Sequence, residues 1–142
     1  MHSYFIYLAG GMTNLSFEQY TKWRRELKNQ LENHIYSKFY SVNVIDPTEY
    51  FNFEVKRHES EKEVVEFDLH KVRTSNLIVV NFNAPQSLGT MAELAVAYEH
   101  RIPIIGLNED NIEIHPWLEH FCSRTFKNKE ELLNYVSDYY LN

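Results

Sequence analysis

The sequence predicts an α/β fold in which helices cover both faces of a mostly parallel, five-stranded sheet. Short apolar segments rich in β-branched residues, typical of buried strands, alternate with segments whose apolar residues recur at helical spacing. Such alternation of strand and helix favours a parallel sheet between two layers of helices. The expected architecture is therefore a three-layer sandwich of the flavodoxin or Rossmann-like type.

Five segments are predicted to be strands, and the clearest is the apolar run that ends at Phe82. The first strand is expected to end at Gly10-Gly11, because glycine accepts turn geometries that other residues resist. The predicted strands cover residues 4–9, 42–45, 77–82, 102–106 and 124–126. A loop is expected to fill the chain between the last two strands.

Four segments are predicted to be helices, three of them after a capping residue: Ser16, Ser60 or Asn128. The first helix has an apolar face that recurs at helical spacing, formed by Tyr20, Trp23, Leu27 and Leu31. The predicted helices cover residues 16–32, 60–73, 88–100 and 128–140.

Composition excludes several classes of function. With 142 residues and 44% hydrophobic residues, the chain is expected to form a single domain, residues 1–142. The net charge of −6 argues against binding to a nucleic-acid polymer. No apolar run approaches the length of a membrane span, the amino terminus lacks a signal-peptide pattern, and Cys122 is the single cysteine. A cytoplasmic protein is expected.

Aromatic residues make up 15% of the chain, more than one small core usually needs. Buried aromatic side chains at a subunit interface would account for the excess. We therefore expect a homo-oligomer, either a dimer or a multiple of dimers. Clamping of a planar ring in a pocket would account for part of the excess.

The predicted topology places a ligand site beyond the carboxyl ends of the first and third strands, where the order of strands reverses. Tyr7, Asp68 and Glu93 are expected to face this crevice. The two loops that follow these strands supply the expected substrate-binding residues, which are Gly10, Met12, Thr13, Asn14, Ser87, Gly89 and Thr90.

Glu93 is expected in the first turn of the helix after Ser87, among backbone N–H groups that attract anions. An ionised carboxylate there suggests a nucleophile beside a phosphate or sugar. The alternative is structural, since Thr90-Met-Ala-Glu93 also fits a capping box in which the glutamate only closes the start of the helix.

Three motifs resemble those of nucleoside 2-deoxyribosyltransferases, and they occur in the same order over nearly the whole chain. Residues Tyr7-Leu-Ala-Gly-Gly-Met-Thr13 are similar to the first strand and loop of that family. Phe67-Asp68-Leu69 resembles its second acidic motif, and Gly89-Thr-Met-Ala-Glu-Leu94 resembles its nucleophile motif. The resemblance implies that Glu93 attacks the anomeric carbon, that Tyr7 positions this carboxylate, and that Asp68 binds and protonates the leaving base.

Ser87 distinguishes two branches of the family. Enzymes that use free nucleosides carry an aspartate at this place, whereas nucleoside 5′-monophosphate N-glycosidases have Ser-x-Gly before the glutamate, as here. A serine hydroxyl and the amides of Gly89 and Thr90 can donate to a phosphate, which an aspartate would repel. This branch often has a basic residue where Thr13 stands, so Arg24, Arg25 or a neighbouring subunit would have to compensate.

The expected function is hydrolysis of the N-glycosidic bond of a (deoxy)nucleoside 5′-monophosphate through a covalent glycosyl-glutamate intermediate. One alternative is a deoxyribosyltransferase that exchanges bases between deoxynucleosides. The other is a nucleotide-binding module without turnover. None of the three requires a cofactor or a metal, and His115 and His120 lack metal-ligand spacing with another His or Cys.

Overall fold

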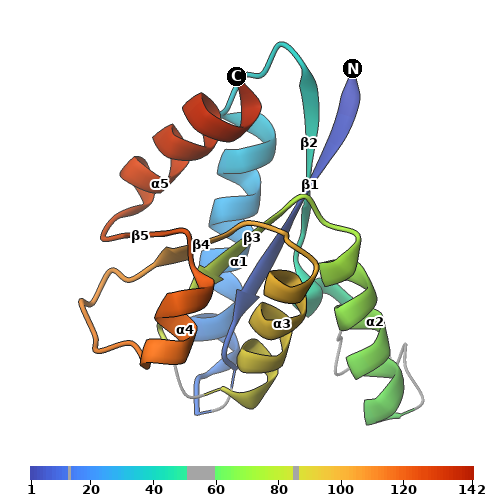
Figure 1. The fold of residues 1–142 in the computed structure, drawn as a ribbon, viewed down its shortest axis with the longest axis vertical. Helices are drawn as coiled ribbons and strands as arrows, with labels where there is room; N and C mark the ends of the chain where they lie inside the picture. Colours follow the sequence, from blue (N-terminus) through green and yellow to red (C-terminus); the bar gives the residue numbers. More distant parts are fainter. Residues whose placement is uncertain (13, 51–59, 85–86) are drawn as a thin grey trace.

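The fold was analysed in a computed structural model, which describes residues 1–12, 14–50, 60–84 and 87–142. It contains a five-stranded sheet with the order β2-β1-β3-β4-β5, and each pair of neighbouring strands is parallel. The strands are β1 (His2–Gly10), β2 (Tyr40–Ile45), β3 (Leu77–Asn81), β4 (Ile104–Leu107) and β5 (Arg124–Phe126). The predicted α/β fold is confirmed (Figure 1).

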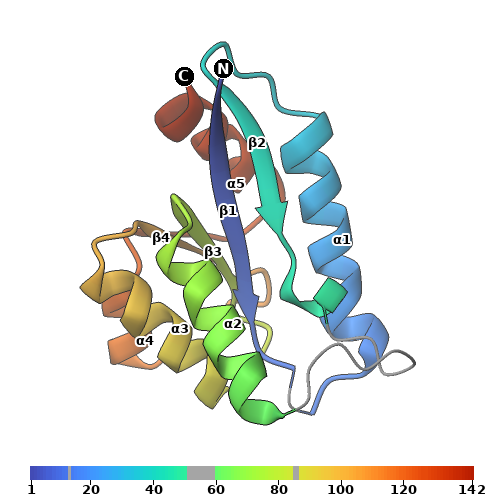
Figure 2. The same ribbon diagram turned by 90° about the vertical axis from the view of Figure 1, so that its right-hand side faces the viewer.

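Helices cover both faces of this sheet, as Figure 2 shows in a view along its edge. The helices are α1 (Phe17–Asn33), α2 (Glu61–Arg73), α3 (Leu88–Glu99), α4 (Pro116–Phe121) and α5 (Lys129–Tyr135). A 3₁₀ turn (Pro47–Tyr50) follows β2, and a π-helical segment (Val136–Leu141) continues α5. Helices α1 and α5 share one apolar core with the sheet, and α2, α3 and α4 share the other.

The alternation of side chains along β1 assigns its residues to these two cores. Ile6 and Leu8 are fully buried on the side of α1, where Leu27 packs against them. Tyr7 and Ala9 point the other way, into the core that contains α3. The tyrosine of the first predicted motif is therefore directed toward the helix that carries Glu93.

Helix α4 was not predicted, because the segment between β4 and β5 was expected to be a loop. The helix begins at Pro116, which suits a first helical position because proline has no N–H to leave unpaired. The His115 side chain caps it by accepting a hydrogen bond from the Trp117 amide at 3.2 Å. A helix of six residues is too short to show a periodic apolar face.

The predicted reason for Gly10-Gly11 is wrong. Neither glycine adopts a positive φ; Asn14 does, with a φ of 64°. Glycine is needed for close approach instead, since a Cβ on Gly10 would lie 2.8 Å from Trp23 Cζ2. A Cβ on Gly11 would lie 2.6 Å from the Ala84 carbonyl oxygen. The loop after β1 is thus packed against both α1 and the loop after β3.

The order of strands reverses at β1, which pairs with β2 on one side and with β3 on the other. Gly10, the last residue of β1, stands opposite Asn81, the last residue of β3. The two loops that follow these strands therefore leave the sheet side by side, as predicted. In α/β sheets this position is where ligands bind.

Candidate active site

A hydrogen bond between Tyr7 and Glu93 joins the end of β1 to α3. The phenol hydroxyl of Tyr7 donates to Oε2 of Glu93. Tyr7 is fully buried, and Glu93 is partly buried. A buried phenol fixed in the sheet holds the carboxylate in one orientation, which is what a reacting group requires.

Asp68 supplies a second carboxylate from α2, the helix that packs against α3. Its charge acts on both Tyr7 and Glu93, so the three side chains form one electrostatic cluster. Its Oδ1 atom is buried and has no hydrogen-bond partner among the described residues. An unpaired buried oxygen is costly, and a donor on a ligand would satisfy it.

Burial raises the pKa values of the acids in this cluster. Burial, reinforced by the charge of Asp68, raises the pKa of Glu93 to about 7, although Tyr7 and Arg24 oppose the shift. Burial likewise raises the pKa of Asp68 to about 7, against the effect of Arg24. The pKa of Tyr7 is well above its usual value, chiefly because of burial. Near neutral pH the two carboxyl groups therefore share protons, and one can be charged while the other holds a proton.

Helix α3 begins one turn earlier than the capping-box alternative requires. Ser87 is its N-cap, and the Ser87 hydroxyl accepts a hydrogen bond from the Thr90 amide at 3.3 Å. Thr90 is the third helical residue, so Thr90-Met-Ala-Glu93 is not a capping box. The prediction of Glu93 in the first turn is wrong as well, since Glu93 lies in the second turn. The Glu93 side chain therefore does not cap the helix.

The expected substrate-binding residues that the structure describes lie at the end of β1, in the loop after it and at the start of α3, and these segments contact each other. A Cβ on Gly11 would lie 3.0 Å from the Ser87 Cβ, so the loop after β1 touches the start of α3. Gly10 is buried at the end of β1, whereas Met12, Asn14 and Gly89 are exposed. Thr13 lies outside the described residues.

Three groups expected to bind the phosphate have partners within the chain. The Thr90 amide is bonded to Ser87 Oγ and is not a free donor, although the buried Thr90 Oγ1 has no partner among the described residues. Arg24, expected as a compensating cation, is 1% exposed and donates from Nη2 to the Gly10 carbonyl at 2.8 Å. Arg25 is exposed and lies 3.5 Å from Glu18.

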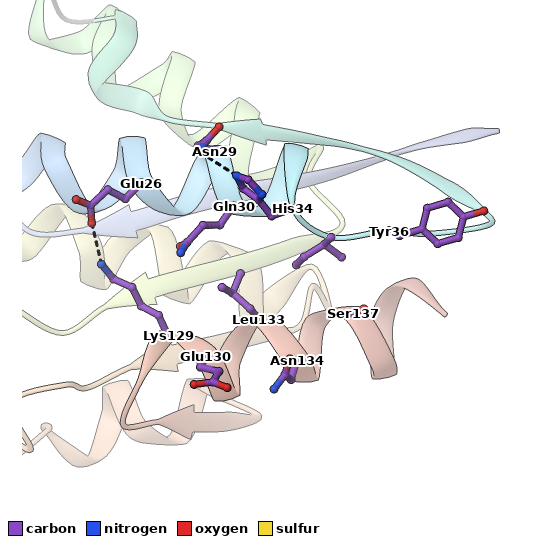
Figure 3. Close-up of a pocket in the computed structure, with 11 residues that line it drawn as sticks. Glu26, Asn29, Gln30, His34, Tyr36, Lys129, Glu130, Leu133, Asn134 and Ser137 are labelled. Carbon is purple, nitrogen blue, oxygen red and sulfur yellow. Dashed lines mark hydrogen bonds and ion pairs between the residues drawn. The ribbon is translucent and has the colours of Figure 1, made fainter.

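A separate hollow of about 850 Å³ lies between α1 and α5 (Figure 3). It is lined by polar side chains, including an ion pair between Glu26 and Lys129 at 3.1 Å. Asn29 and His34 are in contact there at 3.4 Å. Tyr7, Asp68 and Glu93 are not among its lining residues, so their cluster is separate from this hollow.

Comparisons with known proteins identify the family of this chain. Residues 3–111 match the family described as nucleoside 2-deoxyribosyltransferase like. The chain belongs to this family. The match includes the Tyr7, Asp68 and Glu93 motifs, which lie within the aligned residues. No match was found among curated proteins.

Solved structures show the same fold at low sequence identity. A conserved protein from Enterococcus faecalis V583 is 19% identical, with a TM-score of 0.70 over 93% of this chain and 96% of that chain. A 2-deoxyribosyltransferase from Bacillus psychrosaccharolyticus is 17% identical, with a TM-score of 0.69 over 92% and 91%. A CMP N-glycosidase from Clostridium botulinum is 16% identical, with a TM-score of 0.57 over 95% and 99%.

Among the described residues, no helix combines the length and apolar character that a membrane-spanning segment needs.

Proposed function

We propose that this family member cleaves the N-glycosidic bond of a (deoxy)nucleoside 5′-monophosphate, with Glu93 as the nucleophile. The observation that carries the proposal is the hydrogen bond from the Tyr7 phenol to Glu93 in a cluster with Asp68. Two acids with pKa values near 7 suit a reaction that needs one carboxylate and one carboxylic acid.

In the first step a carboxylate oxygen of Glu93 forms a bond to the anomeric carbon of the sugar. The bond between that carbon and the base nitrogen breaks, and its electron pair leaves with the base. Asp68 donates a proton to the departing base. The product is a glycosyl ester on Glu93, as in retaining glycoside cleavage.

In the second step water attacks the same carbon and releases Glu93 as a carboxylate. The proton from water returns to Asp68, and the sugar phosphate leaves. Tyr7 donates to Glu93 throughout and favours its ionised form. Neither step requires a cofactor or a metal.

The start of α3 supports a phosphate as part of the substrate. Ser87 uses its oxygen as an acceptor in the cap, so its O–H remains able to donate to a ligand. The amides of Leu88 and Gly89 open the helix, where backbone N–H groups have no intrahelical partner. The backbone of Gly10, Gly11, Met12, Thr13 and Asn14 is proposed to close the other side of this site.

Base transfer between deoxynucleosides is the second candidate. The observation in its favour is that Arg24 and Arg25 are both engaged and offer no free cation to a phosphate. A neutral 5′-hydroxyl needs no such cation. In this reaction a second base, in place of water, attacks the ester on Glu93.

Kinetics on one nucleoside and its 5′-monophosphate, with wild-type protein and Ser87→Asp, distinguish the candidates. Aspartate is also a good N-cap, so Ser87→Asp keeps the helix start and changes the charge. We expect wild type to prefer the monophosphate by about 100-fold in kcat/KM, because each charge-assisted hydrogen bond contributes ~1.5–3 kcal/mol. Ser87→Asp should reverse this preference. Free-base release provides the readout.

Ser87→Ala is the matched control, since it removes the hydroxyl without adding charge. It should weaken use of the monophosphate and leave the nucleoside rate close to that of wild type, apart from a loss of stability of ~1 kcal/mol from the missing cap. Wild type that prefers the free nucleoside and passes its sugar to an added base would establish the transferase instead. A trapped sugar adduct on Glu93, seen by mass spectrometry, would exclude a module without turnover.

We also propose that the protein is a homo-oligomer, either a dimer or a multiple of dimers. Several large apolar side chains are exposed in the isolated chain, including Leu88 at 86%, Tyr36 at 75% and Trp117 at 67%. Contact with a second copy would cover such side chains. A monomeric mass at micromolar concentration in sedimentation would contradict this proposal.

A further inference from the structure

Arg24 is a buried cation that reaches the site from the opposite face of the sheet. It lies on α1, which packs on the side away from α3, and its side chain is 1% exposed. The guanidinium crosses the end of β1, where Nη2 donates to the Gly10 carbonyl at 2.8 Å. A second donor, Nη1, bonds to the Tyr20 carbonyl within α1.

The partner expected to neutralise Arg24 pairs with it poorly. Asp46, at the end of β2, is also 1% exposed, but Nε of Arg24 lies 4.0 Å from its Oδ1. That oxygen accepts from the Thr48 amide at 2.9 Å, and the other Asp46 oxygen is buried without a partner among the described residues. Arginine and carboxylate side chains usually form hydrogen bonds shorter than this distance, and these are often bidentate.

This geometry argues against a role limited to stability. A buried ion pair commonly contributes no more than apolar residues of the same volume, even when its geometry is good. Here both Arg24 Nε and Asp46 Oδ2 lack a partner among the described residues, which adds a desolvation cost. A buried positive charge that is incompletely paired acts on the other charges near it.

The described charged and titratable groups that act on Glu93 come from three elements. Tyr7 on β1 donates to it, Asp68 on α2 repels its charge, and Arg24 on α1 attracts it. Arg24 is the single cation among them. Without it, no positive charge among these groups would offset the charge of Asp68, and the pKa of Glu93 would rise further.

Arg24 also acts through the backbone. It fixes Gly10, and the next residue, Gly11, packs against Ala84 and Ser87 at the start of α3. The ring of Trp23 lies beneath the guanidinium, 4.6 Å from its carbon, and confines it. Arg24 is thus linked to the loop after β3 only indirectly, through Gly10 and Gly11.

We propose that Arg24 is a positioning residue for the proposed reaction: its buried guanidinium holds the end of β1 in place and supplies a positive charge that favours the ionised form of Glu93. It does not touch the reacting atoms. The inferred effect of Arg24 on catalysis rests on the proposed function. Its effect on the pKa of Glu93 can be measured without any substrate.

The test is titration of the Glu93 carboxyl carbon by ¹³C NMR in protein labelled at glutamate, with the signal assigned by its loss in Glu93→Gln. Arg24→Met should raise the pKa of Glu93 by about one unit, as expected for loss of a nearby opposite charge. Asp46→Asn should lower it, because the charge of Arg24 is then less compensated. Arg25→Met, a change at the exposed neighbour, should leave it unchanged.

The opposite signs separate this role from a structural one. If Arg24 and Asp46 only stabilised the fold, Arg24→Met and Asp46→Asn would break the same pair and shift Glu93 in the same direction or not at all, and either result would overturn the inference. Should Arg24→Met fail to fold, Arg24→Lys keeps the charge and should hold the pKa within half a unit of wild type. A rise of one unit in Arg24→Lys would contradict the charge argument.

In the active enzyme, Arg24→Met should lower kcat/KM about tenfold at pH 6 and much less at pH 9, since the ionised fraction of Glu93 falls tenfold per pKa unit on the acid side. A protein without glycosidase activity but with the NMR shifts would refute the proposed function alone. An active enzyme in which Arg24→Met leaves the pKa of Glu93 unchanged would refute this inference alone.

Discussion

Helix α1 carries charge in two contrasting ways along its length. Arg24 is 1% exposed, sits 4.0 Å from an equally buried Asp46, and leaves polar atoms unpaired. Glu26, two residues later, meets Lys129 at 3.1 Å with both side chains partly exposed to solvent. The pair of Glu26 and Lys129 has the shorter distance, but its electrostatic interaction is weaker because water screens it.

The same contrast separates the two ends of the sheet. Around Glu93 the two acids are partly buried and burial raises their pKa values to about 7, while Asp68 and Thr90 each have a buried oxygen without a partner among the described residues. At the hollow between α1 and α5 (Figure 3), the side chains of Glu26 and Lys129 are partly exposed to solvent. Unfavourable burial of charge indicates function, whereas a hollow alone does not.

The largest effect should come from Glu93→Gln. Glutamine keeps an oxygen that accepts from Tyr7 but cannot form the ester, so we expect turnover to fall by on the order of 10³-fold or more. Free-base release measures this loss, and circular dichroism should show an unchanged fold. Glu99→Gln, at the exposed end of the same helix, is the control and should retain full activity. Turnover close to wild type in Glu93→Gln would end the assignment.

A smaller loss is expected from Tyr7→Phe, which removes the hydroxyl and keeps the ring. A hydrogen bond to a charged group contributes ~1.5–3 kcal/mol, so kcat/KM should fall about 10- to 100-fold. Because this bond lowers the pKa of Glu93, the acid limb of the pH profile should move to higher pH. Tyr98→Phe removes a phenol from the exposed face of α3 and should change neither quantity. An unshifted acid limb in Tyr7→Phe would contradict the proposed role.

The buried acid should also make stability depend on pH. The pKa of Glu93 is about 7 in the folded protein, against an ordinary value of 4.5 in the unfolded chain. Between these two pH values the folded state therefore binds more protons than the unfolded state. Its stabilising contribution is complete below about pH 4.5 and is lost as pH rises through 7. Urea unfolding at pH 5 and pH 8 should show wild type losing about 1–3 kcal/mol more than Glu93→Gln. Equal losses in the two proteins would place Glu93 in solvent.

The fold could be predicted from the sequence because its signals are local: buried strands are continuous apolar runs. The parallel sheet and the adjacency of the first and third strands followed from the alternation of strand and helix. Tyr7, Asp68 and Glu93 were selected by resemblance to family motifs, and their role stays a prediction. The six-residue helix α4 gave no periodic signal and was missed.

Arg24 shows what the sequence left out. It occupies a position on the apolar face of α1, between Tyr20 and Leu27, where a charge is a sign of a buried functional cation. The sequence could not say that its guanidinium turns to Gly10 and away from a ligand. That depends on Trp23 and on the absence of a Cβ at Gly10, which are contacts between separate elements.

The smallest effect is expected at the partly exposed ion pair of α1, and it completes the contrast between the two ion pairs. Lys129→Met removes the partner of Glu26 in the hollow between α1 and α5. Because both side chains are partly exposed, a double-mutant cycle with Glu26→Gln should give a coupling of ~0.2–1 kcal/mol in the free energy of unfolding. Salt should weaken this coupling further, and the pH profile of turnover should stay that of wild type. A coupling above ~2 kcal/mol, or a shifted acid limb, would mean that charge on this face communicates with Glu93 and that the two ends of the sheet are not electrostatically separate.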